Sequence, residues 1–343
     1  MPDLKNNLNM PMAASLQNLP FSFAHFTFHL VARERLELPE YKGSTFRGGL
    51  GHALKQVWCC RPGGRICGKC QNERFCAYSY IFETPKSFGL PTGMHAPNLP
   101  HPFVLLPPLG EYPPSGQEQR IIETGESFSF QLALFGSAIH LVESFVVAFE
   151  RLGEIGIGKK QGKFRLAKVS NSDGSLVYAM GEGLPSGEEP LSSGEVVVRN
   201  YEEFVAAAQS WEGDLLTLRF LTPTHLLHHG RLAEPTFEIF LRRLLGRASE
   251  LAKIHGGQPW DLDYRGIIDS AVAAVRLVNK QLQWQDWERY SNRKEQRMKF
   301  RGFVGTAAYQ GQIKPLLPLI MLGQYLHIGN KTSFGMGKYE IQG

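Results

Sequence analysis

The sequence predicts an α+β protein made of two similar halves, each with an antiparallel sheet and its helices on one face. A length of 343 residues corresponds to about two domains. A strand followed by a helix is predicted twice along the chain. A helix followed by a loop rich in glycine and lysine and then a strand also occurs twice. Self-similarity near half the chain length indicates two duplicated βαββαβ units, the ferredoxin-like arrangement.

The opening of each half is a strand and then a helix. Residues 21–36, FSFAHFTFHLVARERL, alternate apolar and polar side chains as a strand does, and residues 44–58, STFRGGLGHALKQVW, have helical periodicity. In the second half, residues 214–228 predict a strand. Residues 235–256 predict a helix, with proline at its start and glycine at its end.

The closing of each half also follows one pattern. In residues 134–166 and in residues 315–341, LG ends a helix, IG leads to lysine, and GK precedes an aromatic residue. Glycine has no Cβ, so the loops at 156–163 and 329–338 can adopt positive φ and let a partner approach their backbone. Backbone N–H groups and lysine suit a phosphate-bearing partner. The alternative is that both loops are only tight turns.

These patterns predict the domain boundaries. Residues 1–19 are expected to form a flexible N-terminal tail, followed by an N-terminal domain at 20–200 and a C-terminal domain at 201–343. The N-terminal domain carries a cysteine-rich loop insertion at 59–76. It ends in a hairpin and linker at 170–200, where Gly, Ser, Asp, Glu and Pro are frequent.

Composition is that of an ordinary globular protein. With 43% apolar and 20% charged residues, the chain can bury two modest cores. Its start has no apolar segment behind a basic cluster, and no stretch approaches the ~20 apolar residues of a membrane span. We therefore expect a cytoplasmic protein with no membrane partner. The net charge of +5 permits a nucleic-acid partner without requiring one.

All five cysteines fall between residues 59 and 76, which favours a local metal site in a reducing compartment. Four of them form one C-x2-C pair flanked at spacings of six and five residues: Cys60, Cys67, Cys70 and Cys76. This spacing suits a tetrahedral structural zinc ion, with free thiols or an iron–sulfur cluster as alternatives. Cys59 could replace Cys60. Four thiolates leave no position for water, so zinc would hold the loop in shape without catalysing a reaction.

The first predicted helix has two distinct sides. Its apolar side, expected to face the sheet, consists of Phe46, Leu50, Ala53, Leu54 and Val57, and its other side consists of Gly48, His52, Lys55 and Gln56. Three glycines, at 48, 49 and 51, each cost about 1 kcal/mol relative to alanine in a helix. Close approach of a partner would offset that cost, and His52 and Lys55 would then point together at the partner. The alternative is a solvated face with tightly packed glycines.

Residues 284–301 combine basic and aromatic side chains. The basic residues are Arg289, Arg293, Lys294, Arg297, Lys299 and Arg301, among Trp284, Trp287, Tyr290 and Phe300. Basic side chains neutralise phosphates and aromatic rings stack on unpaired bases, so the mixture favours RNA binding. The alternative is a solvated amphipathic helix or hairpin.

The remaining histidines are weaker candidates. His225, His228 and His229 follow LTPT at a strand end, and a hydrogen-bonded structural role is expected for each. His327 precedes the last loop and is a second catalytic candidate.

Several ordered blocks resemble a known family. They are YKGSTFRGGLGHAL, CGKCQNERFCAYSYIFET, HPFVLLPP, GIGKKQGKFRL, LTPTHL, WERYSNRKEQRMKFRGFVGTAAYQG and HIGNKTSFGMGKYEI. From about residue 24 onward, the chain resembles the CRISPR precursor-RNA processing endoribonucleases of the RAMP (repeat-associated mysterious protein) superfamily. The resemblance implies two tandem ferredoxin-like (RAMP/RRM-like) domains. It also implies metal-independent cleavage of CRISPR repeat RNA by attack of a ribose 2′-hydroxyl, which leaves a 2′,3′-cyclic phosphate and a 5′-hydroxyl.

Such chemistry needs a base, an acid and positive charge on the phosphate. We assign His52 as general base or acid and Lys55 or Lys331 as the cation. Residues expected to hold RNA are Arg47, Gly158, Lys159, Lys160, Lys163, Arg289, Arg293, Arg297, Lys299, Gly329, Lys331, Gly335, Gly337 and Lys338. Subunits of a CRISPR effector complex are further candidate partners. Two alternatives stay open: a non-catalytic RNA-binding RAMP subunit, and a zinc-dependent enzyme acting at the cysteine cluster.

Overall fold

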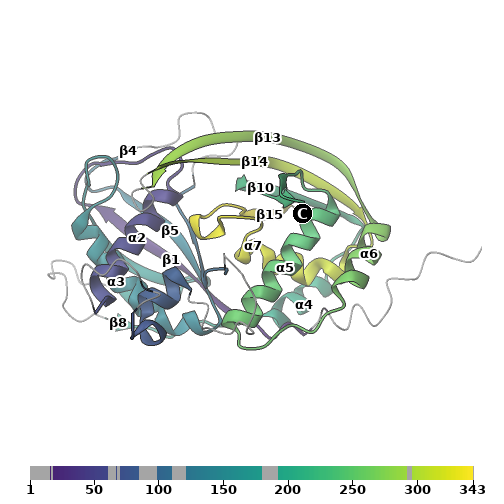
Figure 1. Ribbon diagram of the computed structural model, residues 1–343, viewed down its shortest axis with the longest axis horizontal. Helices are drawn as coiled ribbons and strands as arrows, with labels where there is room; N and C mark the ends of the chain where they lie inside the picture. Colours follow the sequence, from purple (N-terminus) through teal and green to yellow (C-terminus); the bar gives the residue numbers. More distant parts are fainter. Residues whose placement is uncertain are drawn as a thin grey trace, which may run out of the picture. The chain divides into compact units, whose positions relative to one another are not determined.

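The chain divides into two units, each built on an antiparallel sheet (Figure 1). The computed structural model describes residues 16, 18–60, 67, 70–84, 99–109, 121–179, 192–291 and 296–342. The N-terminal unit consists of Ser22–Arg199 and Ile254–Gly257. The C-terminal unit consists of Asn200–Lys253 and Gln258–Gly343, together with the described residues before Ser22.

The N-terminal unit is a ferredoxin-like fold with additions. Its core elements are β1 (Ser22–Ala32), α2 (Gly43–Trp58), β3 (Phe103–Leu106), β5 (Ser127–Phe135), α3 (Val142–Ile155) and β6 (Phe164–Asn171). They follow one another as βαββαβ, and the sheet order β3-β5-β1-β6 places β1 between β5 and β6 in antiparallel pairing. The predicted fold class is confirmed for this half.

Shorter elements complete the N-terminal unit. They are β2 (Leu36–Glu37), η2 (Glu73–Phe75), η3 (Ser79–Glu83), β4 (Ile121–Ile122), η4 (Gly136–Leu141), β7 (Leu176–Ala179), β8 (Ser192–Ser193) and, at the unit boundary, β9 (Arg199–Asn200). The segment β7 pairs with β6 through a tight turn, so the predicted hairpin after residue 170 is present. Residues 180–191 of the predicted linker lie outside the described part.

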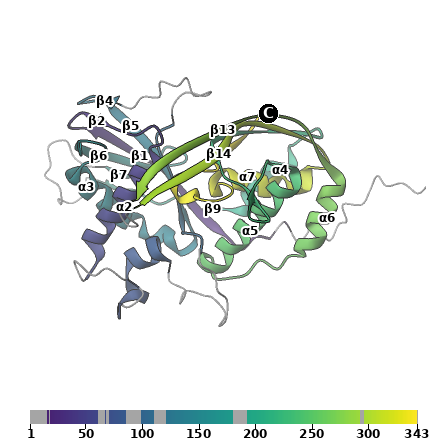
Figure 2. The same ribbon diagram turned by 45° about the horizontal axis from the view of Figure 1, so that its top comes forward.

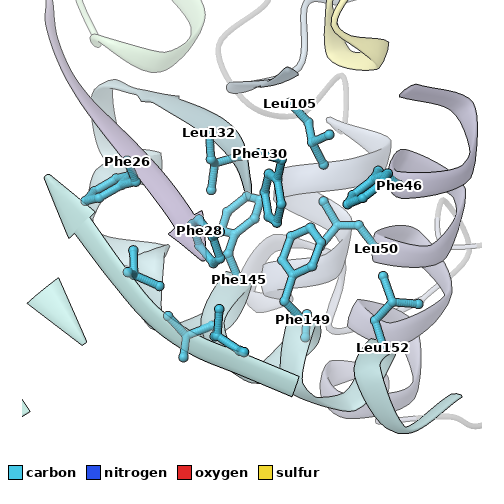
Figure 3. Close-up of a cluster of buried hydrophobic side chains, with 14 of the residues drawn as sticks. Phe26, Phe28, Phe46, Leu50, Leu105, Phe130, Leu132, Phe145, Phe149 and Leu152 are labelled. Atoms are coloured by element: carbon cyan, nitrogen blue, oxygen red, sulfur yellow. The ribbon is translucent and has the colours of Figure 1, made fainter. Parts of the chain in front are cut away.

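Aromatic side chains fill the core between the sheet and the two helices (Figure 3). Alternate residues of β1 point inward, and Phe28 stacks on Phe130 of β5 with ring centroids 4.8 Å apart. The ring centroid of Phe149 on α3 lies 4.4 Å from that of Phe130, so this pair connects the helix to the sheet. Each fully buried phenylalanine contributes about 1.5–3 kcal/mol relative to an exposed one.

The apolar side of α2 is confirmed with one exception. Phe46, Leu50, Ala53 and Leu54 are buried as expected. Val57 has the same angular position but is 36% exposed, because it lies in the last turn, just before the helix ends at Trp58.

The C-terminal unit repeats the fold. Its core elements are β10 (Leu215–Thr224), α5 (Phe237–His255), β13 (Val275–Ser291), β14 (Gln296–Gly311), α7 (Leu317–Leu326) and β15 (Tyr339–Gln342). The sheet order β13-β14-β10-β15 matches that of the first half. The additional elements are α4 (Tyr201–Gln209), β11 (Leu227–His228), β12 (Arg231–Leu232), α6 (Tyr264–Ala274), η5 (Lys314–Leu316) and η6 (Thr332–Phe334).

Two long strands, β13 and β14, form a hairpin that extends beyond the rest of this sheet (Figure 2). Pairing runs from Val275 opposite Gly311 to Ser291 opposite Gln296. The strand β10 pairs with β14 only as far as Phe303, so the distal part of the hairpin is a two-stranded ribbon. Of the two secondary structures considered for residues 284–301, the hairpin is therefore the one that forms.

Buried tyrosines tie the second sheet to its helices. The Tyr309 hydroxyl donates to the Pro235 carbonyl over 2.7 Å, and the Tyr339 hydroxyl donates to the Ile320 carbonyl over 2.6 Å. Burial raises the pKa of both phenols, so they stay protonated donors. Across the described residues of both units, no helix has the length and apolarity needed to span a bilayer.

Candidate active site

The helix α2 presents its candidate catalytic side chains on the side opposite the core. His52 is exposed and Lys55 is half-buried. The Gln56 side-chain amide donates to His52 Nε2 over 2.9 Å. The Lys55 ammonium lies 5.8 Å from the ring centroid of Tyr78. Both predicted residues are therefore on the accessible part of the same helix, three positions apart.

The three glycines of α2 have different surroundings. A Cβ on Gly49 would lie 2.7 Å from Leu152, and one on Gly51 would lie 2.4 Å from the Phe82 ring. These two glycines allow close internal packing, which agrees with the alternative of tightly packed glycines. A Cβ on Gly48 would have nothing within 4 Å. Only Gly48 fits the prediction of a glycine kept for an outside partner.

Arg47, predicted to bind RNA, lies against the protein. Its guanidinium donates to His101 Nε2 over 2.9 Å and lies 4.4 Å from the Phe82 ring centroid. The other ring nitrogen of His101 is 3.3 Å from the Thr84 hydroxyl. Sequence reasoning missed His101, because its contact with Arg47 joins segments 54 residues apart and has no local signal.

The first glycine-lysine loop packs on the segment that contains β2. A Cβ on Gly158 would lie 2.3 Å from the Glu37 carbonyl oxygen, and the Lys159 amide donates to that oxygen over 2.9 Å. Gly158 therefore has an internal role: it lets two segments of the chain approach closely.

Two lysines of this loop, Lys160 and Lys163, pair with acidic side chains. Lys160 forms a 2.9 Å ion pair with Glu37, whose pKa is lowered mainly by this hydrogen bond, and Lys163 lies 3.9 Å from Glu34. The lysine side chains remain 69% and 53% exposed. Such surface pairs contribute about 0–1 kcal/mol, so a phosphate can replace the carboxylate as the partner.

The second loop is held by its own backbone in the same way. Gly329, Gly335 and Gly337 all have φ near +80°. A Cβ on Gly337 would lie 1.9 Å from the Ile328 carbonyl oxygen, and one on Gly329 would lie 2.4 Å from the His225 carbonyl oxygen. The closest backbone partner of these two glycines is therefore the protein itself, whatever else the loop binds.

Lys331 is unusual within this loop. Its φ is +63°, a left-handed conformation that costs a non-glycine residue about 1 kcal/mol or more. Its ammonium lies 3.9 Å from the Phe300 ring centroid on β14. Backbone strain of this kind clusters at ligand sites, which agrees with the predicted role of Lys331.

Lys338 is half-buried and makes an internal contact. The sequence suggests a surface cation, but the Lys338 ammonium donates to the Gln324 carbonyl oxygen over 3.0 Å, and burial lowers its pKa. It satisfies a carbonyl near the C-terminal end of α7, where helical carbonyls lack partners. Its role in the fold is therefore structural.

The histidines near this loop also have structural contacts. His225 Nδ1 donates to the Arg301 carbonyl over 2.6 Å, and the Asn330 amide donates to the His225 carbonyl over 3.0 Å. Burial lowers the pKa of His225, the hydrogen bond to the Arg301 carbonyl partly opposes this, and the charge of Lys331 adds a smaller lowering. His327 is 2% exposed, and its Nδ1 donates to the Met336 carbonyl over 3.1 Å. Burial removes His327 from the surface where a second catalytic candidate was expected.

The aromatic residues of the hairpin pack against each other. Trp284 pairs with Phe303 across the strands, with ring centroids 5.4 Å apart, and Trp287 pairs with Phe300, with ring centroids 5.5 Å apart. Lys299 and Arg301 are exposed, and Arg301 is paired with Asp286 at 3.3 Å. The side chains of Arg289 and Arg297, and all of Arg293 and Lys294, lie outside the described part.

The cysteine segment shows a turn but no assembled metal site. The Cys70 amide donates to the Cys67 carbonyl over 2.8 Å, and Asn72 contacts Cys60 Sγ at 3.5 Å. Burial and the nearby carboxylate of Glu83 raise the pKa of the Cys67 thiol. Among the described residues, which include all five cysteines, no three Cys, His, Asp or Glu side chains are grouped as metal ligands.

Two tandem ferredoxin-like folds with cationic, glycine-rich loops define the class of protein: a RAMP-type protein. Residues 218–339 match the family model of the CRISPR-associated endoribonuclease Cas6, and residues 19–189 match a model described as an N-terminal domain. Residues 218–339 therefore form a Cas6 domain, which confirms the resemblance found in the sequence.

Other proteins are similar over most of this chain. An uncharacterized protein of Archaeoglobus fulgidus is 25% identical over 315 residues, which cover 89% of this chain and 93% of that protein. Thermus thermophilus Cas6 has a TM-score of 0.52 at 16% identity, covering 94% of this chain and 99% of its own. A chain of a partial Cas6-RT-Cas1–Cas2 complex has a TM-score of 0.56 at 12% identity. The match covers 95% of this chain and 47% of that chain. At these identities the two structures show a shared fold.

Proposed function

We propose that this protein binds CRISPR repeat RNA and cuts the precursor transcript by intramolecular attack of a ribose 2′-hydroxyl. One observation carries the proposal: a chain with a Cas6 domain exposes His52, whose Nε2 accepts a hydrogen bond, three residues before Lys55 on one helix. An exposed imidazole is the side chain best suited to proton transfer near neutral pH.

The reaction needs only protein groups in this proposal. The 2′-hydroxyl loses its proton to a base, the 2′-oxygen bonds to the adjacent phosphorus, and the bond from phosphorus to the 5′-oxygen breaks. The products are a 2′,3′-cyclic phosphate and a 5′-hydroxyl, which takes up one proton. His52 makes one of these proton transfers, and Lys55 or Lys331 stabilises the charge on the phosphate.

The loops and the hairpin hold the RNA in this proposal. Lys159, Lys160 and Lys163 lie on the first loop, Lys331 lies on the second loop, and Lys299 lies on β14. Their charges neutralise backbone phosphates, and the ion pairs of Lys160 and Lys163 exchange carboxylate for phosphate. Assembly with other CRISPR proteins is a further candidate partnership, since one similar structure is titled a Cas6-RT-Cas1–Cas2 complex.

Cleavage of a labelled repeat RNA in EDTA tests the function. Wild-type protein should yield a cyclic-phosphate end, and His52→Ala should slow cleavage by about 10²–10⁴-fold, the usual contribution of general acid–base catalysis. Lys55→Ala and Lys331→Ala show which lysine stabilises the charge on the phosphate, because loss of that lysine should also slow cleavage. His140→Ala, an exposed histidine of the same unit, is the matched control.

Two results would contradict the proposal. Binding of repeat RNA without cleavage by the wild type would favour a non-catalytic RAMP subunit. Cleavage at an unchanged rate by His52→Ala would remove His52 from the reaction.

A structural zinc ion is a separate proposal that rests on cysteine spacing. Cys60, Cys67, Cys70 and Cys76 would supply four thiolates, and the ion would hold the loop that follows α2. Catalysis does not involve this ion.

A further inference from the structure

A chain of hydrogen bonds links His52 to a charged pair on the neighbouring helix. Arg151 on α3 forms a 2.8 Å ion pair with Glu154. Arg151 Nε also donates to Gln56 Oε1 over 3.1 Å, and Gln56 Nε2 donates to His52 Nε2 over 2.9 Å. The order Glu154, Arg151, Gln56, His52 crosses from α3 to α2 within the N-terminal unit.

The chemistry of these groups fixes the direction of every bond. A guanidinium only donates, so the atom of Gln56 that faces Arg151 must be its carbonyl oxygen. The Gln56 amide group that faces His52 must therefore be the NH2, which also only donates. His52 Nε2 has to accept, so it carries a lone pair, and the single ring proton is on Nδ1.

Protonation of His52 breaks this arrangement. An imidazolium has N–H on both nitrogens and cannot accept a bond from Gln56. To accept a proton from His52 instead, the Gln56 amide would have to turn over, and its NH2 would then face the Arg151 guanidinium. The bond that Arg151 makes to Gln56 therefore fixes the Gln56 amide as a donor toward His52 Nε2.

We infer that Gln56, oriented by Arg151, is a positioning residue that holds His52 as the general base, with Nε2 as the proton acceptor. This inference rests on the proposed function and makes it more specific, since the residues alone left base and acid open. In the free protein the Gln56 NH2 occupies the place that a substrate hydroxyl takes. The 2′-hydroxyl replaces it as donor, passes its proton to Nε2, and its oxygen forms the new bond to phosphorus. The leaving 5′-oxygen receives its proton from another acid.

Among the described residues, charged groups near His52 lie on α2 and α3. Lys55 lies one turn further along α2, and the Arg151–Glu154 pair lies on α3. Replacing Gln56 with glutamate changes the nearest of these contacts and leaves the others in place. A carboxylate still accepts from Arg151 but now also accepts from His52, so it stabilises the imidazolium.

Single-turnover cleavage by Gln56→Glu, measured from pH 5 to 9 in EDTA, tests the inference. Raising the proton affinity of a base moves the acidic limb of the pH–rate profile to higher pH. We expect that shift, with a rate loss of about 10-fold or more near pH 6 and recovery to within about 3-fold of wild type at the alkaline end. Gln56→Ala removes the hydrogen bond without adding a charge, so it should move the acidic limb much less than Gln56→Glu does. Gln209→Glu, which adds the same charge on an exposed site of α4, should leave the profile unchanged.

Other shapes of the profile would overturn the inference. If His52 is the general acid, Gln56→Glu should move the alkaline limb of the pH–rate profile to higher pH and leave the acidic limb unchanged. If neither limb moves, Gln56 is not coupled to His52. A second readout is independent of turnover: 15N NMR of the His52 ring should show Nδ1 protonated and Nε2 unprotonated at neutral pH, and Arg151→Met should weaken that preference. A proton on Nε2 of His52 in the wild-type protein at neutral pH would also refute the inference.

The failure of this inference differs from the failure of the proposed function. Cleavage that depends on His52 but has an unshifted profile in Gln56→Glu overturns the role of Gln56 and keeps the nuclease. No cleavage by the wild type overturns both. Circular dichroism of each variant checks that the substitution leaves the fold intact.

Discussion

Glu150 on α3 is a carboxyl group whose environment disfavours its charge. Burial raises the pKa of Glu150, the neighbouring Glu154 adds to the rise, and a hydrogen bond from the Tyr178 hydroxyl partly opposes it. The folded state therefore binds a proton at Glu150 more tightly than the unfolded state. The associated stability is fully present below the ordinary pKa of glutamate and is lost as the pH rises through the raised value.

This pKa shift predicts that Glu150→Gln stabilises the protein at alkaline pH. The glutamine oxygen still accepts from Tyr178, and no buried charge remains. We expect a Tm rise of about 1–3 °C at pH 8, where 1 kcal/mol corresponds to about 2–4 °C, and almost none at pH 4. Thermal unfolding at both pH values measures it. Glu212→Gln, at an exposed loop carboxyl, is the control; equal Tm changes for the two variants would refute the prediction.

At the scale of one element, α2 contains two kinds of glycine. Gly49 and Gly51 allow close packing inside the protein, whereas Gly48 faces open space that a partner can approach. Gly48→Ala adds a Cβ into open space and should stabilise the helix by up to about 1 kcal/mol, whereas Gly51→Ala meets the Phe82 ring and should destabilise it. Denaturant unfolding measures both changes. If RNA approaches this helix closely, Gly48→Ala should also slow cleavage despite its higher stability. Unchanged cleavage would place the RNA elsewhere.

The cysteine loop is the second element that makes a measurable prediction. If the four thiolates bind zinc, protein purified without chelators should contain about one zinc per chain by elemental analysis. Cys70→Ser should lower that content, and Cys59→Ser tests whether Cys59 takes the place of Cys60. Absence of zinc from the wild-type protein would refute the proposal and leave free thiols. Chelation that abolishes cleavage without unfolding would favour a catalytic metal instead.

At the scale of the whole molecule, the proposal requires both glycine-lysine loops to bind the same RNA. For single-stranded RNA, removing one lysine that neutralises a phosphate should reduce the slope of log affinity against log salt by about 0.7. We expect Lys160→Gln and Lys331→Gln each to have this effect, and the double variant to reduce the slope by about 1.4. Binding titrations at several salt concentrations measure the slopes. Lys253→Gln on α5 is the control, and a double variant no different from one single variant would refute binding by both loops.

Much of the architecture could be predicted from sequence because its signals are local. The strand at β1, the helix at α2 and the two closing loops follow from periodicity and glycine placement within about 15 residues. The candidate site was only partly predictable. His52 could be placed on the exposed side of α2 from helical geometry. The contact of Arg47 with His101 and the bond of Lys338 to the Gln324 carbonyl could not be foreseen.

The sequence by itself determined the duplicated halves, their strand and helix order, the resemblance to a family of RNA-processing proteins, and the residue types available for RNA cleavage. These depend on neighbours in the chain and on the alternation of apolar and polar side chains. Tertiary structure decided which glycines serve the fold, which lysine bonds a helix carbonyl, and which nitrogen of His52 accepts a hydrogen bond. Those outcomes depend on segments far apart in sequence: Gln56 is oriented by Arg151, 95 residues away, because α2 and α3 pack side by side.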